Sequence, residues 1–400
     1  MKEDWKECKL SEIMTLIGGG TPKTSNPDYW NGDIPWISVK DFNGERRYVI
    51  DTEKKITKLG LENSSTKLLS KGDIIISARG TVGELAIIPS DMAFNQSCYG
   101  LRAKEYVDST FLYYLLKQSV SILQHNTHGS VFDTITRDTF DGITINLPPL
   151  ATQQKIATIL SSLDDKIELN NKINDNLEQQ AQAIFKSWFV DFEPFGGKMP
   201  EEWRIGKVGD LGEIICGKTP STKIKEYYGN ECPFITIPDM HNNVYACFTE
   251  RYLSKLGMES QIGKSLPVNS VCVSCIATPG LVILTDKISQ TNQQINSIIP
   301  NKNMSSYYVY LLMQSLAETI KMLGSSGSTT SNLNKDQFSK IVVLIPAIYE
   351  LKIFNSIVEP LFQNIRNNIH ENQNLAFLRD TLLPKLLNGE IDVDEVKARK

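Results

Sequence analysis

Apolar side chains recur at steps of four and three along residues 151–189. This spacing keeps them on one stripe of an α-helix, as in the seam of a coiled coil, while Gln, Lys, Asp, Glu and Asn fill the positions between. A helix of this length, about 58 Å at 1.5 Å per residue, does not bury its stripe alone and therefore requires a partner. The stripe comprises Ile156, Leu160, Leu163, Ile167, Asn170, Asn174, Leu177, Ala181, Ile184 and Trp188.

A second stripe with the same steps lies near the C-terminus and supplies that partner. Each of its members follows its counterpart by 198 positions (354 − 156 = 198), including the two asparagines. A buried asparagine in a seam fixes the register, because a slipped pairing leaves its amide unsatisfied. We therefore expect Asn170, Asn174, Asn368 and Asn372 to set the register of two paired helices, although two unrelated amphipathic helices are the alternative. The second stripe comprises Phe354, Val358, Leu361, Ile365, Asn368, Asn372, Leu375, Arg379, Leu382 and Leu386.

The same offset extends over the rest of the chain, which therefore contains an internal repeat. Gly-Gly-Thr-Pro at 19–22 matches Gly-Lys-Thr-Pro at 217–220. After a gap of one residue, Asn-Gln at 95–96 matches Asn-Gln at 292–293. Further matches are Trp5 with Trp203, 34–41 with 232–239, 76–83 with 273–280, and 143–148 with 341–346.

Within each half, short apolar runs bounded by Gly, Pro and Asp predict strands, and capped segments starting at Ser109 and Ser306 predict helices. The predicted fold class is α+β, with two similar mixed α/β domains separated by two long antiparallel coiled-coil helices in a pseudo-two-fold internal repeat. The expected boundaries are 1–150 for the first domain, 151–195 for the first long helix, 196–346 for the second domain, and 347–400 for the second long helix and C-terminal tail.

The composition, 41% hydrophobic and 22% charged, is that of an ordinary soluble protein of two or three domains. The first residues are charged and no apolar run reaches the length of a membrane span, so a cytoplasmic location is expected. Seven cysteines, an odd number, fit a reducing compartment better than a disulfide framework. The net charge of −4 argues against a uniformly basic nucleic-acid binder, but a local patch can still bind DNA.

On these features the whole chain resembles the specificity subunit of type I restriction-modification systems, a family often called HsdS. The most specific matches flank the first helix, Leu-Pro-Pro-Leu-Ala-Thr-Gln-Gln-Lys-Ile-Ala at 147–157 and Phe-Lys-Ser-Trp-Phe-Val-Asp-Phe at 185–192. Leu-Leu-Pro-Lys-Leu-Leu-Asn-Gly-Glu-Ile at 382–391 closes the chain in the same style, and the two Thr-Pro loops look like the family's domain-opening signature. The second helix departs from the pattern at its start, where Ala-Ile-Tyr-Glu at 347–350 lacks the double proline and the glutamine pair.

The resemblance implies that each globular domain is a target-recognition domain that reads one half of a bipartite DNA target. The helices would set the spacer and dock two DNA-methyltransferase subunits, and restriction subunits would join through the complex. The chain itself would be no enzyme and hold no cofactor, since S-adenosylmethionine, ATP and magnesium belong to the partner subunits. Apolar residues at the helix ends would dock those partners, the alternative being that they only pack against each other: Phe185, Trp188, Phe189, Leu382, Leu383 and Leu386.

Two other patterns point to different chemistry. Residues 212–219 satisfy the phosphate-loop pattern G-x-x-x-x-G-K-T, but the middle is apolar, Pro220 follows, and Lys218 has only a glycine, Gly20, as its repeat partner. The C-x-x-C at 272–275 lies in a strand-like run without a second pair, so we expect no metal site. No nucleophile–base set stands out, and no catalytic residue is predicted. A phosphate-loop nucleotide-binding protein and a coiled-coil interaction protein that does not bind DNA remain the alternatives.

DNA contacts are expected from loops rich in Lys, Arg, Ser, Thr, Asn and Gln, which hold phosphates or read base edges. Arg79 is best placed, in a glycine-containing turn that ends an apolar strand. Its repeat counterpart is Ile276, as expected if the two domains read different bases. Solvated loop charge without a role is the alternative for each residue. The candidates are Lys23, Thr24, Ser25, Lys40, Arg79 and His128 in the first half, and Lys218, Ser221, Lys223, Lys225 and Ser326 in the second.

Overall fold

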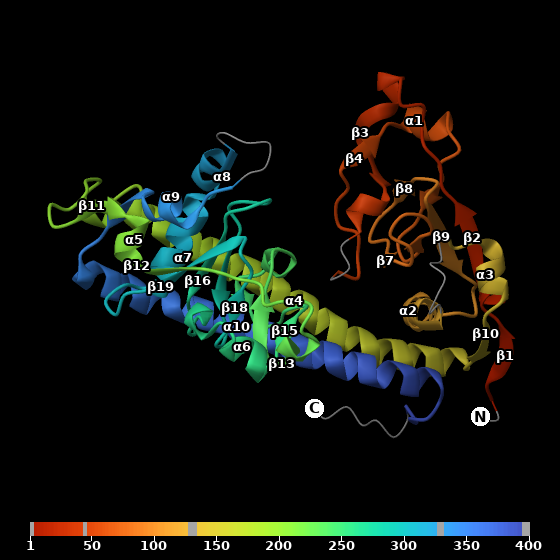
Figure 1. The fold of residues 1–400 in the computed structure, drawn as a ribbon. Helices are drawn as coiled ribbons and strands as arrows, with labels where there is room; N and C mark the ends of the chain where they lie inside the picture. Colours follow the sequence, from red (N-terminus) through yellow and green to blue (C-terminus); the bar gives the residue numbers. More distant parts are fainter. Residues whose placement is uncertain (1–3, 43–45, 127–133, 326–331, 394–400) are drawn as a thin grey trace. The chain divides into compact units, whose positions relative to one another are not determined.

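A computed structural model of the 400-residue chain describes residues 4–42, 46–126, 134–325 and 332–393. The chain folds into two compact units. The first unit comprises Met1–Glu168 and Gln373–Lys400, and the second comprises Leu169–Asn372. Two 40-residue helices, α4 (Leu150–Phe189) and α10 (Ile348–Leu387), each contribute one segment to both units (Figure 1).

The start of α4 is held by the double proline and the glutamine that follows it. The Pro149 carbonyl accepts hydrogen bonds from the backbone N–H groups of Thr152 and Gln153 at 2.9 and 3.0 Å, which begins the helix. The buried side chain of Gln153 donates to the Pro148 carbonyl and accepts from the backbone N–H of Asp108, both at 2.9 Å. The motif therefore ties the start of the helix to the first domain.

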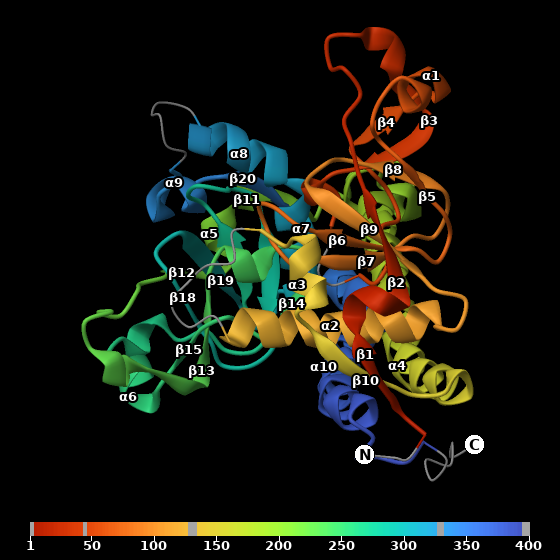
Figure 2. The same cartoon turned by 90° about the vertical axis from the view of Figure 1, so that its right-hand side faces the viewer.

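In the first unit, a four-stranded antiparallel sheet in the order β2-β9-β6-β7 packs on α2 (Ser109–Asn126). Figure 2 shows α2 between this sheet and the first-unit part of the long helices. A second sheet, in the order β4-β3-β8-β5, carries the short helix α1. The bounds are β1 (Lys6–Lys9), β2 (Met14–Gly18), β3 (Trp30–Ile37), β4 (Lys54–Ile56), α1 (Lys58–Glu62), β5 (Leu68–Leu69), β6 (Ile74–Ser77), β7 (Leu85–Ile87), β8 (Met92–Phe94), β9 (Cys98–Ala103), α3 (Arg137–Asp141) and β10 (Thr144–Leu147), the last paired with β1.

The second unit repeats this topology. Its main sheet, in the order β12-β19-β16-β17-β14, begins with the same four strands, and the added β14 pairs with β17 where the first unit has a single bridge from Tyr48 to Ile87. The bounds are β11 (Arg204–Lys207), α5 (Val208–Leu211), β12 (Gly212–Cys216), β13 (Tyr228–Ile235), β14 (Tyr245–Ala246), β15 (Tyr252–Leu253), α6 (Lys255–Glu259), β16 (Val271–Ser274), β17 (Val282–Thr285), β18 (Gln290–Thr291), β19 (Ile295–Pro300), α7 (Ser306–Ser315), α8 (Ala317–Ser325), α9 (Lys335–Ser339) and β20 (Val342–Ile345).

Within each unit, the α4 and α10 segments pair in opposite directions. In the second unit, Asn170 Nδ2 donates to Asn372 Oδ1, and Asn368 Nδ2 donates to Asn174 Oδ1, both at 2.8 Å. Residue numbers therefore rise along one helix as they fall along the other. In the first unit, where Arg379 pairs with an acid on α4, the direction is the same. The predicted fold class is confirmed: two similar mixed domains, two long antiparallel helices and an internal repeat.

The domain boundaries expected from the sequence stay a prediction. Helix α4 ends at Phe189, before residue 195, and a short 3₁₀ turn (Glu193–Phe195) follows it. The compact units divide inside both long helices instead of at their ends, because each end packs against its own globular domain. Among the described residues, no helix has both the length and the apolar character to cross a membrane.

Candidate nucleic-acid interface

In the first unit, the opening loop 19–22 lies against the turn that follows β8. The backbone N–H of Gly20 donates to the Phe94 carbonyl at 3.0 Å. A Cβ on Gly19 would stand only 2.1 Å from the Asn95 carbonyl oxygen, so this approach requires glycine. The Thr21 hydroxyl then donates a short hydrogen bond to Oε1 of Gln96, whose side chain is exposed.

The second unit builds the same arrangement from its own residues. A Cβ on Gly217 would stand 2.0 Å from the Asn292 carbonyl oxygen, and the next N–H, of Lys218, donates to the Thr291 carbonyl at 2.9 Å. The Thr219 hydroxyl donates to Oε1 of the exposed Gln293 at 2.6 Å. We call these two contacts, Thr21 with Gln96 and Thr219 with Gln293, the Thr–Gln pairs.

The turn that presents each glutamine is braced by the asparagine before it. Asn95 Oδ1 accepts from the backbone N–H of Ser97 at 3.0 Å, and Asn292 Oδ1 accepts from that of Gln294 at 3.0 Å. Asparagine suits this role because its short side chain bonds to the backbone two residues on. The repeated Asn-Gln motif thus holds the glutamine at the surface in both domains.

Arg79 lies beside this turn in the first unit. The Ser97 carbonyl accepts hydrogen bonds from the backbone N–H groups of Ala78 and Arg79, at 2.8 and 3.2 Å. Gly80 follows with a φ of +83°, and the Arg79 side chain is exposed. The opening loop, the Asn-Gln turn and the end of β6 therefore converge on one edge of the domain.

The equivalent edge of the second unit has a different surface. Ile276 replaces Arg79 and is partly buried, and Ala277 replaces Gly80 while keeping a positive φ of 65°. The turn itself is conserved, because Ser274 Oγ donates to the Thr278 carbonyl at 2.6 Å, as Ser77 does to the Thr81 carbonyl. The two domains share a backbone scaffold and differ in the side chain that it presents.

The other predicted DNA-contact residues are surface side chains on loops. In the first unit, Lys40 lies 3.8 Å from Glu53, which offsets part of its charge. His128 and Ser326 lie outside the residues that the structure describes. Nothing in the structure tests a DNA role for any candidate. The exposed ones are Lys23, Thr24, Ser25, Lys40 and Arg79, and Lys218, Ser221, Lys223 and Lys225.

The seam asparagines form a connected hydrogen-bond network in the second unit. Besides the two cross-helix pairs, Asn170 Nδ2 donates to Glu371 Oε2, and Asn372 Nδ2 donates to Asn171 Oδ1, both at 2.7 Å. Asn170 is fully buried. In this alignment the Nδ2 groups of Asn170, Asn368 and Asn372 all have acceptors, while Oδ1 of Asn170 has no hydrogen-bond partner among the described residues. A slipped pairing would separate these donors from their acceptors.

The family model described as "Type I restriction modification DNA specificity domain" matches residues 2–179 and 200–376. This chain belongs to that family. It is 35% identical to the type I restriction enzyme HindI specificity subunit of Haemophilus influenzae, over 97% of this chain and 100% of the relative. It is 30% identical to the MjaIX specificity subunit of Methanocaldococcus jannaschii, over 98% of this chain and 95% of the relative.

Among solved structures, the S subunit of a type I restriction-modification system from M. genitalium has a TM-score of 0.58 with this chain. The two are 16% identical, and the match covers 96% of each. This likeness shows a shared fold. Both matched stretches of the specificity-domain model contain one opening loop and one Asn-Gln turn, so each copy of the family domain carries one Thr–Gln pair.

The phosphate-loop alternative is not supported for this member of the family. Such a loop needs free backbone N–H groups around the phosphate and a helix behind it. Residues 212–216 form strand β12, Gly217 N–H donates to the Ile295 carbonyl at 3.0 Å, and Lys218 N–H is also bonded. The next helical residues are the three of Lys225–Tyr227. Family membership likewise gives no support to a coiled-coil protein without DNA recognition domains.

The apolar residues at the helix ends mostly lie in the cores of their units. Phe185 and Phe189 pack with Phe354 and Tyr308 in an aromatic cluster, with ring centroids 4.8 to 6.5 Å apart. The burial of four candidates favours packing over partner docking for them, while two keep some exposed surface. The buried four are Phe185, Phe189, Leu383 and Leu386, and the partly exposed two are Trp188 and Leu382.

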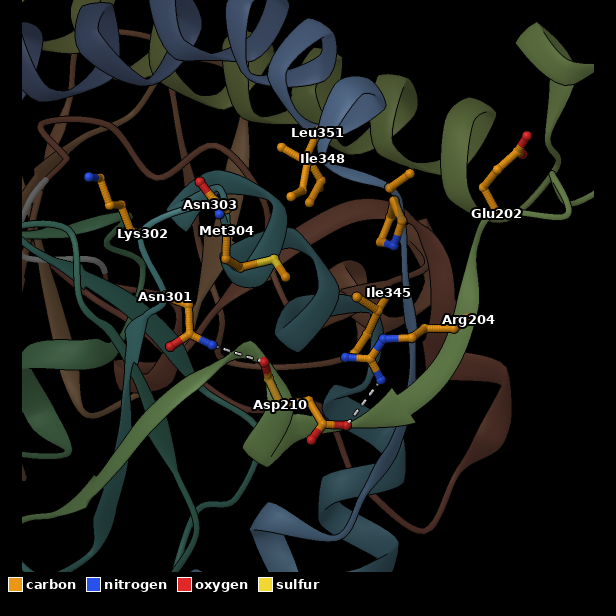
Figure 3. A pocket seen from close by; sticks show the side chains of 12 residues that line it. Glu202, Arg204, Asp210, Asn301, Lys302, Asn303, Met304, Ile345, Ile348 and Leu351 are labelled. Atoms are coloured by element: carbon orange, nitrogen blue, oxygen red, sulfur yellow. Dashed lines mark hydrogen bonds and ion pairs between the residues drawn. The ribbon is translucent and has the colours of Figure 1, made fainter.

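A pocket of about 520 Å³ lies in the second unit at the start of α10 (Figure 3). Arg204 and Asp210 on its wall pair with each other, with 3.5 Å between Nη1 and Oδ2. A hydrogen bond from the backbone N–H of Lys207 lowers the pKa of the Asp210 carboxyl. The lowered pKa favours the ionised carboxylate that pairs with Arg204.

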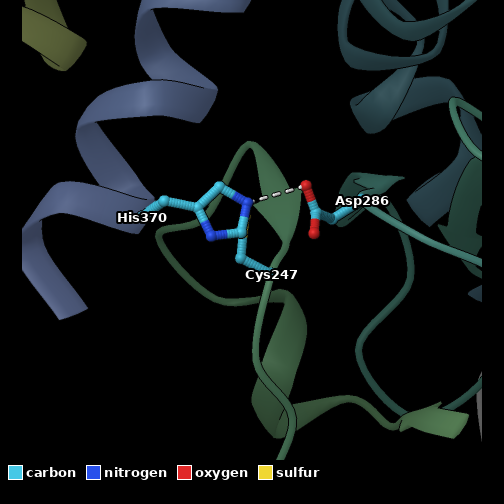
Figure 4. A group of neighbouring side chains, drawn as sticks. All are labelled: Cys247, Asp286 and His370. Carbon is cyan, nitrogen blue, oxygen red and sulfur yellow. Dashed lines mark hydrogen bonds and ion pairs between the residues drawn. The ribbon is translucent and has the colours of Figure 1, made fainter. Parts of the chain in front are cut away.

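Cys247, Asp286 and His370 form a second cluster in this unit, with their ligand atoms within 4.8 Å of one another (Figure 4). Asp286 Oδ1 already accepts from Arg366 Nε at 2.6 Å and lies 3.0 Å from His370 Nε2. Burial, with the nearby Asp286, raises the pKa of the Cys247 thiol, so the thiol stays protonated. In this arrangement Asp286 links the second domain to α10 through its contacts with Arg366 and His370.

Proposed function

We propose that this chain is the DNA sequence-specificity subunit of a type I restriction-modification enzyme. Each globular domain reads one half of a bipartite DNA target through the edge where the opening loop, the Asn-Gln turn and the strand end converge. One observation supports this most directly. The two domains share the scaffold of that edge but present Arg79 in one and Ile276 in the other, as two readers of different half-sites require.

The long helices set the distance between the half-sites in this proposal. Both are single 40-residue helices that pair in opposite directions, and the seam asparagines favour one register. A spacer of constant register fits a target whose two halves are separated by a fixed number of unspecified base pairs.

The catalytic work belongs to other subunits. We propose that two DNA-methyltransferase subunits bind this chain and that restriction subunits join through the complex. S-adenosylmethionine, ATP and magnesium would be bound by those partners, so the chain is a recognition subunit and no enzyme by itself. The cytoplasmic location expected from the sequence stays a prediction.

Mapping methylated adenines in the host genome, with and without this gene, tests the recognition role. We expect the loss of one bipartite motif with a fixed gap when the gene is removed. Unchanged methylation would overturn the proposal.

A matched change in both helices tests the spacer role. Shortening both by one heptad should narrow the gap and leave the half-site sequences unchanged, because a heptad preserves the seam. Shortening only one helix by the same heptad is the control, and it should abolish methylation by misaligning the seam. A gap that stays the same after the matched change would argue against a spacer role.

A further inference from the structure

We infer that the glutamine of each Thr–Gln pair contacts DNA independently of the DNA sequence. In this contact, Nε2 of Gln96 or of Gln293 donates a hydrogen bond to a phosphate of the DNA backbone. The inference rests on the proposed function and adds to it a contact common to both half-sites. Neither glutamine belongs to the core, and both side chains are exposed.

The duplication of the pairs is the first argument. Fold similarity alone explains repeated core residues, but it does not require the same side-chain hydrogen bond at an exposed position in two domains. The surface next to the pairs has diverged, as Arg79 and Ile276 show. An exposed side-chain contact that both domains keep, next to a position where their side chains differ, indicates a ligand feature that both domains meet.

The orientation of each amide is the second argument. Oε1 of Gln96 and of Gln293 accepts from the threonine hydroxyl in both copies, which leaves the amide nitrogen to donate elsewhere. Within the described part of the chain, neither Nε2 has a hydrogen-bond partner. The threonine therefore holds the glutamine in one orientation and presents two N–H donors.

The nature of the acceptor follows from DNA chemistry. Phosphate oxygens are the groups that every half-site presents regardless of sequence, and side-chain amides commonly bond to them. Lys23 lies two residues after Thr21, and Lys218 directly precedes Thr219, so each pair has a neighbouring cation in the chain. A base edge would not serve both domains equally, because the bases differ between half-sites.

The test uses the full chain assembled with its modification subunits, bound to a duplex with the mapped target and to one without it. Gln96→Glu and Gln293→Glu keep an oxygen that accepts from the threonine hydroxyl but remove the N–H donors. We expect each to weaken binding to both duplexes by the same factor, on the order of tenfold. The ratio of the two affinities and the methylated motif should not change.

Further variants distinguish the effect of losing the N–H donor from the effect of added negative charge and from a loss of folding. Gln96→Met and Gln293→Met remove the donor without adding charge, and they should weaken binding in the same way. Asn303→Asp adds the same charge at an exposed amide in the loop between β19 and α7, and it should leave binding unchanged. Thermal unfolding of each variant checks that the fold is intact.

The outcomes distinguish this inference from the proposed function. Unchanged affinity for both duplexes, or a change of preference at one base pair, would overturn the phosphate contact while leaving the recognition role standing. Failure of the unmodified complex to prefer the mapped target would overturn the proposed function itself.

Discussion

Arg379 of α10 and Asp164 of α4 form a buried ion pair, with 2.6 Å between Nη1 and Oδ1. Asp164 also accepts a hydrogen bond from the Tyr114 hydroxyl at 2.5 Å, and burial together with Asp164 raises the pKa of that tyrosine. The equivalent positions in the second half are Ala181 and Phe362 (379 − 181 = 362 − 164 = 198), both fully buried and apolar. The helix segments that pack against the first and the second domain are thus chemically distinct. This difference disfavours a misfolded arrangement in which a domain packs against the helix segments of the other domain.

Replacing Arg379 by alanine should destabilise the first unit by about 3 kcal/mol, because it leaves Asp164 buried without its partner charge. Combining Arg379→Ala with Asp164→Phe and Tyr114→Leu, the residues of the second half, should recover most of that loss. Urea unfolding of the full chain, followed by circular dichroism, measures both. A triple variant no more stable than the single one would contradict the idea that the two packings are interchangeable.

Asn170→Ala should lower the free energy of unfolding by about 1–3 kcal/mol, since it removes the hydrogen bonds from Asn170 Nδ2 to Glu371 and Asn372 across the helix pair. Asn176→Ala on the same helix is the matched control. Its exposed side chain accepts a hydrogen bond from the exposed Gln180, so its effect should stay within about 0.5 kcal/mol. Equal effects of the two substitutions in urea unfolding would argue against a special role for the seam network.

Arg79→Ala should relax the sequence preference at one position of a single half-site, at a cost of about 1–3 kcal/mol in binding the mapped target. A guanidinium reads a base edge through two hydrogen bonds, and alanine has no donor to replace them. Adenine-methylation mapping should show the change in one half-site only. Ile276→Ala, at the equivalent turn, is the comparison and should leave that half-site unaffected. A loss of binding equal for all sequences would assign Arg79 to phosphate instead.

Asp286→Asn should reduce the acid sensitivity of the second unit. Burial alone would raise the pKa of this carboxyl, but hydrogen bonds from His370 and Arg366 outweigh it and lower the pKa below its ordinary value. A lowered folded-state pKa stabilises the fold above the unfolded pKa, about 3.9, and that stabilisation is lost as the pH falls through the folded value. As the pH falls from about 6 to about 3, the variant should therefore lose less stability than the unmodified chain. Thermal unfolding against pH measures it, and parallel curves would refute the linkage.

The Thr–Gln pairs could be predicted from the sequence only in part. The repeated Asn-Gln and Thr-Pro motifs are visible in the chain, yet nothing local joins them, because Thr21 and Gln96 are 75 positions apart. Neither glutamine was among the predicted DNA-contact residues, because nothing in the linear chain shows that its turn lies beside the opening loop. A repeat that preserves polar residues at exposed positions was the one available clue.

Arg379 illustrates the same limit in the helices. Its place in the seam follows from the 4-3 spacing, but its partner Asp164 lies just outside that spacing and 215 positions away. The four seam asparagines were identifiable, because an exception to a periodic pattern is itself part of the pattern. Their hydrogen-bond partners on the other helix depend on the direction and alignment of the two helices, which only the structure shows.

The sequence by itself determined the repeat, the fold class and the pairing of two long helices, because periodicity and a constant offset are properties of the linear chain. Only the tertiary structure decided which loops share an edge, which end of the helix pair is charged and which aromatic, and which apolar residues are buried. Those features depend on contacts between segments far apart in the chain, where the energy of one side chain is set by its neighbours in space.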